Sequence, residues 1–322
     1  MKKNSETILV TGAAGFIGFH VSKALLNKGI KVIGIDNLNS YYDVKLKKAR
    51  LKILKKDTGF TFIKLDLCNY QKLKKVFKKY SFTKICNLAA QAGVRYSLKN
   101  PFEYQRSNLE GFLNIIELAK EFKIEKFVYA SSSSVYGGNT KTPFSIKDDV
   151  SRPVSFYGAT KRANELIAYT YHHLYNLPVV GLRFFTVYGP WGRPDMAYYG
   201  FTKAILEGRS IDVYNYGKMK RDFTYIDDIV EGVLNSLEKP FDSEIFNLGN
   251  SNTVELLYFI ECLEKGLNIK ADKKMLPIQP GDVPETFADI EYSREKLGFA
   301  PKTNIEEGIS SFLEWYKDYY GK

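Results

Sequence analysis

Residues 11–18 read Thr11-Gly12-Ala13-Ala14-Gly15-Phe16-Ile17-Gly18 and stand between a short apolar run, Ile8-Leu9-Val10, and a segment whose apolar residues recur at helical spacing. A glycine-rich turn between a strand and a helix is typical of dinucleotide-binding folds. In that setting Gly12 permits the tight turn, Gly15 lets the backbone approach a diphosphate, and Gly18 lets helix and strand pack closely. The phosphates would lie at the helix N-terminus, where free N–H groups and the helix dipole favour anions.

The chain around this turn alternates apolar runs with helical patterns for about 180 residues. Further strands are predicted at residues 32–35, 60–65, 85–89, 127–130 and 179–182. Such alternation indicates an α/β fold, a doubly wound parallel (Rossmann) sheet with helices on both faces. After Arg183 the pattern loosens into loops rich in glycine and proline. We therefore expect a dinucleotide-binding domain over residues 1–183, to which residues 224–250 return, and a smaller C-terminal α/β lobe over residues 184–322 that binds the substrate.

Composition excludes several classes of protein. The 322 residues, 44% hydrophobic and 26% charged, contain no run of about 18 apolar residues that could span a bilayer. The first residues lack the apolar segment of a signal peptide. Three scattered cysteines give no disulfide framework, which favours a reducing, cytoplasmic location. Neither they nor the three histidines show metal-ligand spacing, so we predict no metal.

The net charge of +11 is compatible with nucleic acid, an anionic membrane or an acidic small substrate. Much of it lies in residues 45–56, where Leu46, Ala49, Ile53 and Leu54 keep helical spacing. This pattern predicts a helix with a solvated basic face formed by Lys45, Lys47, Lys48, Arg50, Lys52, Lys55 and Lys56. The chain contains no nucleic-acid recognition motif, so we expect neither nucleic acid nor a membrane as a partner.

Acidic residues after the second and third strands point to a particular dinucleotide. Asp36 ends the second strand, where a carboxylate can accept both hydroxyls of the adenosine ribose and repel a 2′-phosphate. Asn37 follows rather than an arginine, so NAD is favoured over NADP. Asp66 and Leu67 follow the third strand, where adenine contacts usually arise. A turn or N-cap role for Asp66 is an equal alternative.

Tyr157 and Lys161 stand four residues apart, which places both on one face of a helix. A neighbouring ammonium would lower the pKa of the phenol and allow it to act as a base. The spacing alone carries no weight, because seven other Tyr-x-x-x-Lys matches occur in the chain. Tyr157 is distinguished by the preceding apolar strand, which runs into Ser131-Ser132-Ser133-Ser134. For the serine run alone, a plain polar loop is the simpler interpretation.

Together these features resemble the extended short-chain dehydrogenases/reductases over nearly the whole chain. Within that family, Leu88-Ala89-Ala90-Gln91-Ala92-Gly93-Val94-Arg95-Tyr96-Ser97 and Arg221-Asp222-Phe223-Thr224-Tyr225-Ile226-Asp227-Asp228 resemble nucleotide-sugar epimerases. The most specific segment resembles UDP-glucuronate 4-epimerases: Arg183-Phe184-Phe185-Thr186-Val187-Tyr188-Gly189-Pro190-Trp191-Gly192-Arg193-Pro194-Asp195-Met196-Ala197.

The resemblance implies a mechanism and a catalytic set of Ser132, Tyr157 and Lys161. Tyr157 would take the proton of the sugar 4-hydroxyl while hydride passes from carbon 4 to NAD⁺. The 4-keto sugar would then turn over and receive the hydride on its other face. Lys161 would hold the nicotinamide ribose, and Ser132 would bind the reacting oxygen. The implied cofactor-binding residues are Gly12, Gly15, Phe16, Ile17, Gly18, Asp36, Asn37, Asp66, Leu67, Ala89, Ala90, Tyr157 and Lys161.

The same resemblance implies substrate-binding residues: Arg95, Ser133, Ser134, Thr186, Arg193, Arg221 and Asp282. Thr186 and Arg193 suit a carboxylate on the sugar, although Arg193 could also be a surface arginine. Arg221 is either a diphosphate clamp or a solvated residue. Asp282 would bind the uridine end or simply form a turn with Pro280 and Gly281.

Ser134 stands where related dehydratases and decarboxylases carry a glutamate, which favours epimerisation. We therefore expect 4-epimerisation of UDP-glucuronate to UDP-galacturonate, by a homodimer as is usual in the family. The alternatives are a 4-epimerase of UDP-glucose or of UDP-N-acetylglucosamine or its uronate, a UDP-glucuronate decarboxylase, and a non-catalytic NAD-binding regulator.

Overall fold

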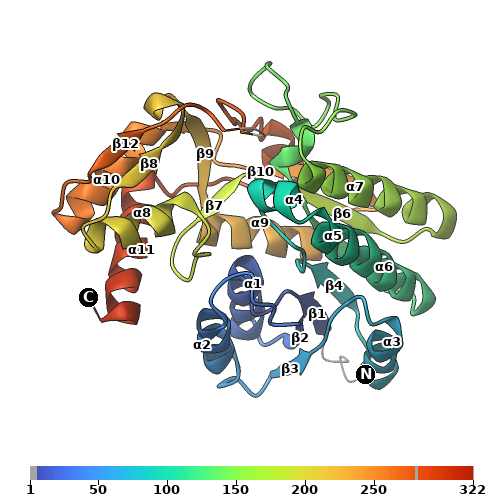
Figure 1. Cartoon of the computed structure of the whole chain (residues 1–322). Coiled ribbons are helices and arrows are strands. Elements are labelled where there is room, and N and C mark those ends of the chain that lie inside the picture. Colours follow the sequence, from blue (N-terminus) through green and yellow to red (C-terminus); the bar gives the residue numbers. More distant parts are fainter. Residues whose placement is uncertain (1–5, 280–281, 322) are drawn as a thin grey trace.

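Seven parallel strands form the main sheet of the computed structural model, which describes residues 6–279 and 282–321 (Figure 1). Their spatial order is β10-β6-β5-β4-β1-β2-β3. The strands are β1 (Thr7–Thr11), β2 (Lys31–Asp36), β3 (Phe60–Lys64), β4 (Lys84–Asn87), β5 (Lys126–Ser132), β6 (Val179–Phe184) and β10 (Ser243–Leu248). The order turns back between β1 and β4, and a reversal of this kind opens a crevice at the carboxyl ends of the strands. The predicted doubly wound fold is confirmed.

Helices cover both faces of this sheet because its strands are apolar on both sides. In β1, Ile8 and Val10 belong to one hydrophobic cluster and Leu9 to the other, as the two-residue period of a strand requires. One face is covered by α1 (Phe16–Asn27), α2 (Val44–Leu54) and α9 (Ile226–Glu238). The other is covered by α3 (Tyr70–Lys79), α6 (Gly111–Glu121) and α7 (Phe156–Tyr175) (Figure 1).

Short helical segments complete this part of the molecule. They are α4 (Val94–Lys99), α5 (Pro101–Tyr104), a π-helical segment (Gln105–Glu110) that leads into α6, and a 3-10 turn (Ser133–Tyr136) after β5. Among the described residues, no helix is both long and apolar enough to cross a membrane.

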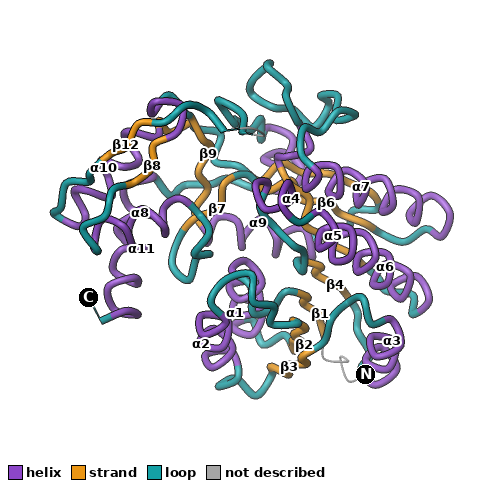
Figure 2. Tube along the Cα trace, viewed as in Figure 1, coloured by secondary structure: helices purple, strands orange, loops and turns teal. Residues whose placement is uncertain are grey.

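A smaller lobe carries two further sheets (Figure 2). One has the order β11-β9-β7, formed by β7 (Thr186–Tyr188), β9 (Lys220–Tyr225) and β11 (Thr253–Glu255). The other pairs β8 (Ile211–Val213) with β12 (Lys273–Met275). Three helices pack there around a third hydrophobic cluster: α8 (Ala197–Leu206), α10 (Leu256–Leu267) and α11 (Ile305–Tyr320). A 3-10 turn (Tyr214–Gly217) follows β8, and a π-helical segment (Ser293–Leu297) precedes α11.

The segment predicted to return to the large sheet includes α9, which packs on α1, and β10, which pairs with β6. We retain residues 1–183 with 224–250 as the proposed dinucleotide-binding domain.

The basic face predicted for residues 45–56 is wrong at two positions. Helix α2 buries Lys47 and Arg50, which are 5% and 0% exposed, whereas Lys45, Lys48, Lys52, Lys55 and Lys56 are exposed. The two buried cations lie beside Leu46, Leu51 and Leu54 on the side of α2 that faces the protein. The ammonium of Lys47 donates to Asn39 in the segment before α2, and the guanidinium of Arg50 donates to Trp191 in a distant loop; helical spacing reveals neither contact.

Candidate active site

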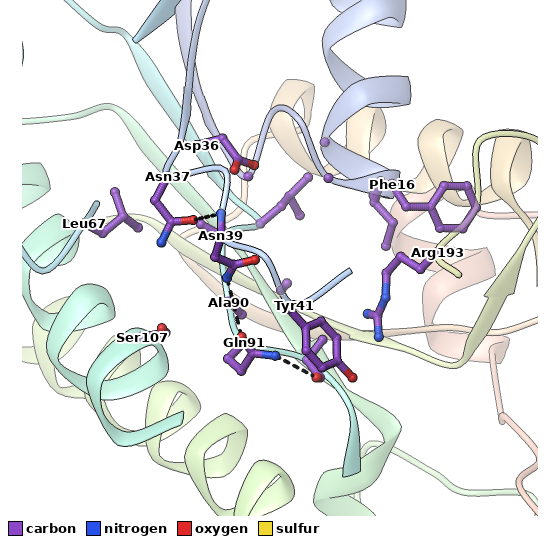
Figure 3. A pocket seen from close by; sticks show the side chains of 18 of the residues that line it. Phe16, Asp36, Asn37, Asn39, Tyr41, Leu67, Ala90, Gln91, Ser107 and Arg193 are labelled. Carbon is purple, nitrogen blue, oxygen red and sulfur yellow. Dashed lines mark hydrogen bonds between the residues drawn. The ribbon is translucent and has the colours of Figure 1, made fainter. Parts of the chain in front are cut away.

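A cavity of about 250 Å³ lies at the carboxyl ends of the strands of the large sheet (Figure 3). It brings together every residue that we predicted for the cofactor, and it also contains Ser132. Those residues come from the glycine-rich turn, the ends of β2, β3, β4 and β5, and the first turns of α7. In a parallel sheet these strand ends meet at one edge, so residues far apart in sequence become neighbours. Their assignment to NAD itself remains a prediction.

The glycine-rich turn is too tightly packed for side chains. Gly12 has a φ of +68°, and a Cβ atom on it would stand 2.9 Å from the backbone nitrogen of Ala89. A Cβ atom on Gly18 would stand 2.1 Å from the carbonyl oxygen of Gly12. Gly15 caps α1 without a side-chain hydrogen bond, and the first turn of α1 contains no acidic residue. The uncapped N–H groups on the cavity wall therefore fit a diphosphate.

Asp36 is held at the end of β2 by two backbone donors. Its carboxylate accepts hydrogen bonds from Leu38 N–H (2.8 Å) and Ala14 N–H (3.2 Å). A carboxylate has about four acceptor positions, so Asp36 keeps capacity for two ribose hydroxyls. This arrangement fits the adenosine end of NAD.

Asp66 forms a turn but is not the N-cap of α3. Its carboxylate accepts from Cys68 N–H (2.9 Å) and from Asn37 Nδ2 (3.3 Å), and it pairs with Arg106 (2.8 Å). The N-cap of α3 is Asn69. The turn role that we left open is therefore present, and Asp66 lines the cavity as well.

The Tyr157/Lys161 pair lies at the start of α7. Ser155 caps this helix by accepting from Gly158 N–H (3.0 Å), which places Tyr157 in its first turn. Lys161 Nζ donates to the carbonyl oxygen of Ala130 (2.7 Å) and lies 5.9 Å from the centre of the Tyr157 ring. Burial lowers the pKa of Lys161 to about 8. This lysine is therefore anchored to β5 and faces the cavity.

The lowering of the Tyr157 pKa by Lys161 remains a prediction. Burial raises the pKa of Tyr157, and the opposing influences are a hydrogen bond with Ser132 and the positive charge of Arg193. The groups that favour the phenolate here are thus Ser132 and Arg193, one at the end of β5 and the other beyond β7.

A buried ion pair fixes α7 against the sheet below these residues. Arg183 of β6 binds Glu165 of α7 through two hydrogen bonds, Nε to Oε1 (2.8 Å) and Nη2 to Oε2 (3.0 Å). Ser131 Oγ also donates to Glu165 (2.6 Å), and Arg183 donates to the hydroxyl of Tyr136 (3.0 Å). A buried ion pair is tolerated when its remaining donors and acceptors are satisfied. This network fixes α7, which carries Tyr157 and Lys161, against β6 and against Ser131 at the end of β5.

Within the serine run, only Ser131 and Ser132 line the cavity. Ser132 Oγ accepts from Ser134 N–H (3.1 Å) and lies 3.2 Å from Ser134 Oγ, so it caps the short 3-10 turn. Ser133 and Ser134 are partly buried in that turn. The structure does not bring them into the described cavity, and their contact with a substrate remains a prediction.

Arg193 lines the cavity, but two of its nitrogens are already engaged. Nε and Nη2 bind the carboxylate of Asp195 at 3.0 and 2.5 Å, and the hydroxyl of Tyr41 donates to the same carboxylate (3.2 Å). Arg193 is therefore an oriented guanidinium rather than the surface arginine that we considered. Thr186 begins β7 and does not line the cavity, whereas its neighbours Phe185 and Val187 do.

The three remaining predicted substrate residues lie near one another outside this cavity. Arg95 of α4 pairs with Asp282 (2.8 Å), and its guanidinium stacks on the ring of Tyr214 at 4.9 Å. Arg221 donates to the carbonyl oxygens of Lys220 and Pro284. Burial lowers the pKa of Arg221, and the charges of Asp282 and Arg95 also act on it. Asp282 is thus in an ion pair; Pro280 and Gly281, the rest of its predicted turn, lie outside the described residues.

Sequence reasoning missed several residues that shape the site. Asn39, Tyr41, Lys47 and Gln91 line the cavity, and Asn39 Nδ2 donates to Gln91 Oε1 (3.5 Å) (Figure 3). Asn39 and Lys47 belong to the segment that follows β2. The only sequence signal for these two residues is that this segment begins next to Asp36.

Arg50 was also missed, although it does not line the cavity. It is fully buried and donates to Ala14 O (2.8 Å), Tyr42 Oη (2.8 Å), Trp191 O (2.5 Å) and Gly192 O (3.0 Å). The glycine-rich turn and the loop that carries Arg193 are therefore joined through one side chain.

The sheet, the glycine-rich turn, Asp36 and the Tyr157/Lys161 pair define an enzyme of the extended short-chain dehydrogenase/reductase class. Residues 8–249 match the model of the NAD dependent epimerase/dehydratase family, and the chain belongs to this family.

Relatives in this family align with nearly the whole chain. UDP-glucuronate 4-epimerase 4 of Arabidopsis thaliana is 48% identical over 335 residues, which cover 98% of this chain and 76% of that protein. The crystal structure of UDP-glucuronic acid 4-epimerase from Bacillus cereus with UDP-glucuronic acid and NAD is similar with a TM-score of 0.92. It is 36% identical, and the match covers 98% of this chain and 100% of the other. UDP-glucose 4-epimerase from Thermotoga maritima with UDP-glucose is also similar, with a TM-score of 0.90 and 29% identity over 98% and 99% of the two chains.

Proposed function

We propose that this protein is an NAD-dependent UDP-glucuronate 4-epimerase that forms UDP-galacturonate. The observation that carries the proposal is the position of Arg193, whose guanidinium lines the same cavity as Tyr157, Lys161 and Ser132. Arginine is well suited to a carboxylate because its planar donors match the two oxygens. The similarity to UDP-glucuronate 4-epimerases over 98% of the chain supports the same substrate.

In this proposal NAD, when bound, reversibly accepts hydride from carbon 4 of the sugar. Tyr157 removes the proton from the 4-hydroxyl as the ketone forms and returns it to the 4-oxygen when the ketone is reduced. Ser132 binds that oxygen and, with Arg193, favours the phenolate form of Tyr157. Lys161, which donates to Ala130 O beside the Tyr157 ring, would bind the nicotinamide ribose. The 4-keto sugar must rotate between the two steps so that its opposite face is presented.

The serine at position 134 supports epimerisation over decarboxylation. By the resemblance described above, related dehydratases and decarboxylases carry a glutamate at the position of Ser134. Its carboxylate would transfer a proton or orient the substrate for loss of carbon dioxide. Here the place holds a small hydroxyl that interacts with Ser132. This favours a reaction that leaves the sugar carboxylate intact.

A 4-epimerase of UDP-glucose is the second candidate. The observation in its favour is the Arg193–Asp195 pair, because Asp195 already engages two guanidinium nitrogens that a sugar carboxylate would need. The similarity to a UDP-glucose 4-epimerase at 29% identity is weaker support than the 48% identity to a UDP-glucuronate 4-epimerase.

The purified protein, without added NAD, is expected to convert UDP-glucuronate to a mixture with UDP-galacturonate and to leave its bound NAD content unchanged. The reason is that hydride taken from carbon 4 is given back to the same carbon. Products are separated by chromatography and identified by mass spectrometry, with UDP-glucose and UDP-N-acetylglucosamine assayed in parallel. Faster conversion of either neutral sugar would transfer the proposal to the second candidate, and stoichiometric consumption of NAD would indicate a dehydrogenase.

We also propose that the protein is a homodimer. Eight large hydrophobic side chains on α4, α5, α6 and α7 are exposed, six of which we take as one candidate apolar face, and Phe102 is the most exposed at 78%. This apolar face consists of Leu98, Phe102, Leu113, Leu166, Tyr169 and Leu174. The helices that carry these residues pack against one another: α4 and α5 contact each other and α7, and α6 contacts α7. A large exposed apolar patch is typical of a protein interface, and a second copy of the chain would bury it.

Leu166→Glu is expected to shift the protein from dimer to monomer, because it places a charge in the apolar face that would have to be desolvated on association. Light scattering coupled to size-exclusion chromatography measures the molar mass. Leu257→Glu, an equally drastic change at an exposed leucine of α10, is the control and should leave the mass unchanged. A wild-type mass of 36.8 kDa would contradict the proposal.

We further propose that the enzyme works in the cytoplasm. Its three cysteines are free thiols: Cys86 and Cys262 are buried and Cys68 is half-buried. Free thiols are typical of proteins in a reducing compartment.

A further inference from the structure

Lys47 is a buried cation for which the described part of the chain supplies no carboxylate within ion-pair distance. It lies in the first turns of α2, is 5% exposed and lines the cavity. Its ammonium donates to the backbone oxygen (2.9 Å) and the side-chain oxygen (2.7 Å) of Asn39 and lies 4.7 Å from the centre of the Tyr42 ring. Burying an ammonium with only neutral partners is costly, and an anion bound in the cavity would offset that cost.

The charges on the cavity wall leave room for such an anion. Five charged side chains line it: Asp36, Asp66, Lys47, Lys161 and Arg193. Asp66 is paired with Arg106 and Arg193 with Asp195, both through residues outside the lining. Asp36 accepts from two backbone N–H groups, while Lys161 and Lys47 donate only to neutral oxygens. Two lysines thus face one carboxylate that has no cationic hydrogen-bond partner, which suits a ligand with excess negative charge.

The position of α2 indicates which anion Lys47 would meet. Arg50 follows Lys47 by three residues on the same face and donates to Ala14 O inside the glycine-rich turn. The buried basic side of α2 therefore faces the N-terminus of α1, where uncapped N–H groups fit a diphosphate. Asn39, the partner of Lys47, lies between Asp36 and Gln91 in the cavity (Figure 3).

We propose that Lys47 binds the diphosphate of the dinucleotide and adds a positive charge to the N–H groups of the glycine-rich turn. An ammonium has three donors, of which Asn39 uses two, so one remains for a phosphate oxygen. Lysine is a common point-charge partner of phosphates. The inference rests on the NAD dependence in the proposed function but not on the identity of the sugar.

The test compares Lys47→Met with Lys48→Met in the full chain after removal of bound nucleotide. Lys48 is the next residue of α2 and is exposed, so it is a matched control. Calorimetry measures the dissociation constants of ADP-ribose, which contains the diphosphate, and of adenosine, which does not. We expect Lys47→Met to raise the dissociation constant of ADP-ribose by about ten- to a hundredfold, the usual effect of losing a charged hydrogen bond. Adenosine binding should not change, and Lys48→Met should change neither.

A purely structural role for Lys47 would give a different result. If Lys47 only shapes the loop around Asn39, Lys47→Met should raise the dissociation constants of ADP-ribose and adenosine by the same factor. That result would show the proposal to be wrong. Unchanged ADP-ribose affinity would also overturn it. Lys47→Arg, which keeps the charge, should recover most of the lost affinity. These readouts do not involve the sugar, so a failure here is distinct from a failure of UDP-glucuronate as substrate.

Discussion

Tyr157→Phe is expected to lower the turnover number by about a hundredfold or more while NAD stays bound. The variant loses only the hydroxyl that interacts with Ser132, and general-base catalysis contributes about 10²- to 10⁴-fold in rate. The ring contact with Tyr104, at 6.0 Å between centres, can be kept by phenylalanine, so the helix should not move. Initial rates with UDP-glucuronate and the NAD content per chain are the two measurements.

Tyr175→Phe is the matched control for this prediction. Tyr175 ends the same helix, is exposed, and its ring contacts Lys120 in a way that phenylalanine preserves. The control should retain wild-type activity. If Tyr157→Phe kept more than about a tenth of the wild-type rate, Tyr157 could not be the base.

Arg193→Ala is expected to lower kcat/KM for UDP-glucuronate by about ten- to a hundredfold and to spare any activity on UDP-glucose. Removing a charged hydrogen-bond partner costs about 1.5–3 kcal/mol, which corresponds to that range. Only the uronate carries a carboxylate that can use the guanidinium. The measurement is kcat/KM for both sugars, and an equal loss on both would show that Arg193 is structural or binds the diphosphate.

The Arg193→Ala experiment needs a control for the charge of Asp195. Without Arg193 its carboxylate would be left near the cavity and could itself repel the uronate. The double variant Arg193→Ala/Asp195→Asn removes that repulsion. A loss that persists in the double variant measures the attraction by Arg193, whereas a loss that disappears would assign the effect to Asp195.

Arg193 should also suppress a side reaction. The oxidised sugar carries a ketone at carbon 4 and a carboxylate on carbon 5, so it is a β-keto acid that loses carbon dioxide when the breaking bond lines up with the carbonyl. A bidentate contact can hold the carboxylate out of that alignment. In Arg193→Ala we therefore expect a pentose product or released 4-keto sugar that mass spectrometry detects.

That the residues assigned to the cofactor share one cavity could be predicted from sequence because their signals are local. The glycine-rich turn, Asp36 and Ala89 each follow an apolar run, and parallel strands bring their carboxyl ends to one edge. The four-residue spacing of Tyr157 and Lys161 is also local. Knowing the strand order was not necessary to find these residues.

The basic helix was misread because periodicity shows which residues share a face, not what that face meets. Lys47 and Arg50 lie with Leu46 and Leu51 on the buried side, and their polar partners are loops up to 142 residues away. Arg193 pairs with Asp195 only two residues away, but Tyr41, which donates to the same carboxylate, lies 154 residues earlier in the sequence. Thr186, Ser133 and Ser134 were assigned by resemblance, and the described cavity does not reach them.

Arg50 has a consequence for how this chain can be recombined with its relatives. Its guanidinium holds carbonyl groups of Ala14, Trp191 and Gly192, so the loop with Arg193 is seated on a residue that lies far earlier in the sequence. A chimera that grafts residues 184–322 of another family member onto this N-terminal half would keep the guanidinium but set it against a loop of different sequence, whose backbone carbonyl groups need not lie at the same positions. Because an unsatisfied buried charge is strongly destabilising, we expect a cassette that begins at residue 184 to lower stability unless the new loop supplies these carbonyl groups. The graft has to include α2, or at least position 50, together with the loop that it holds.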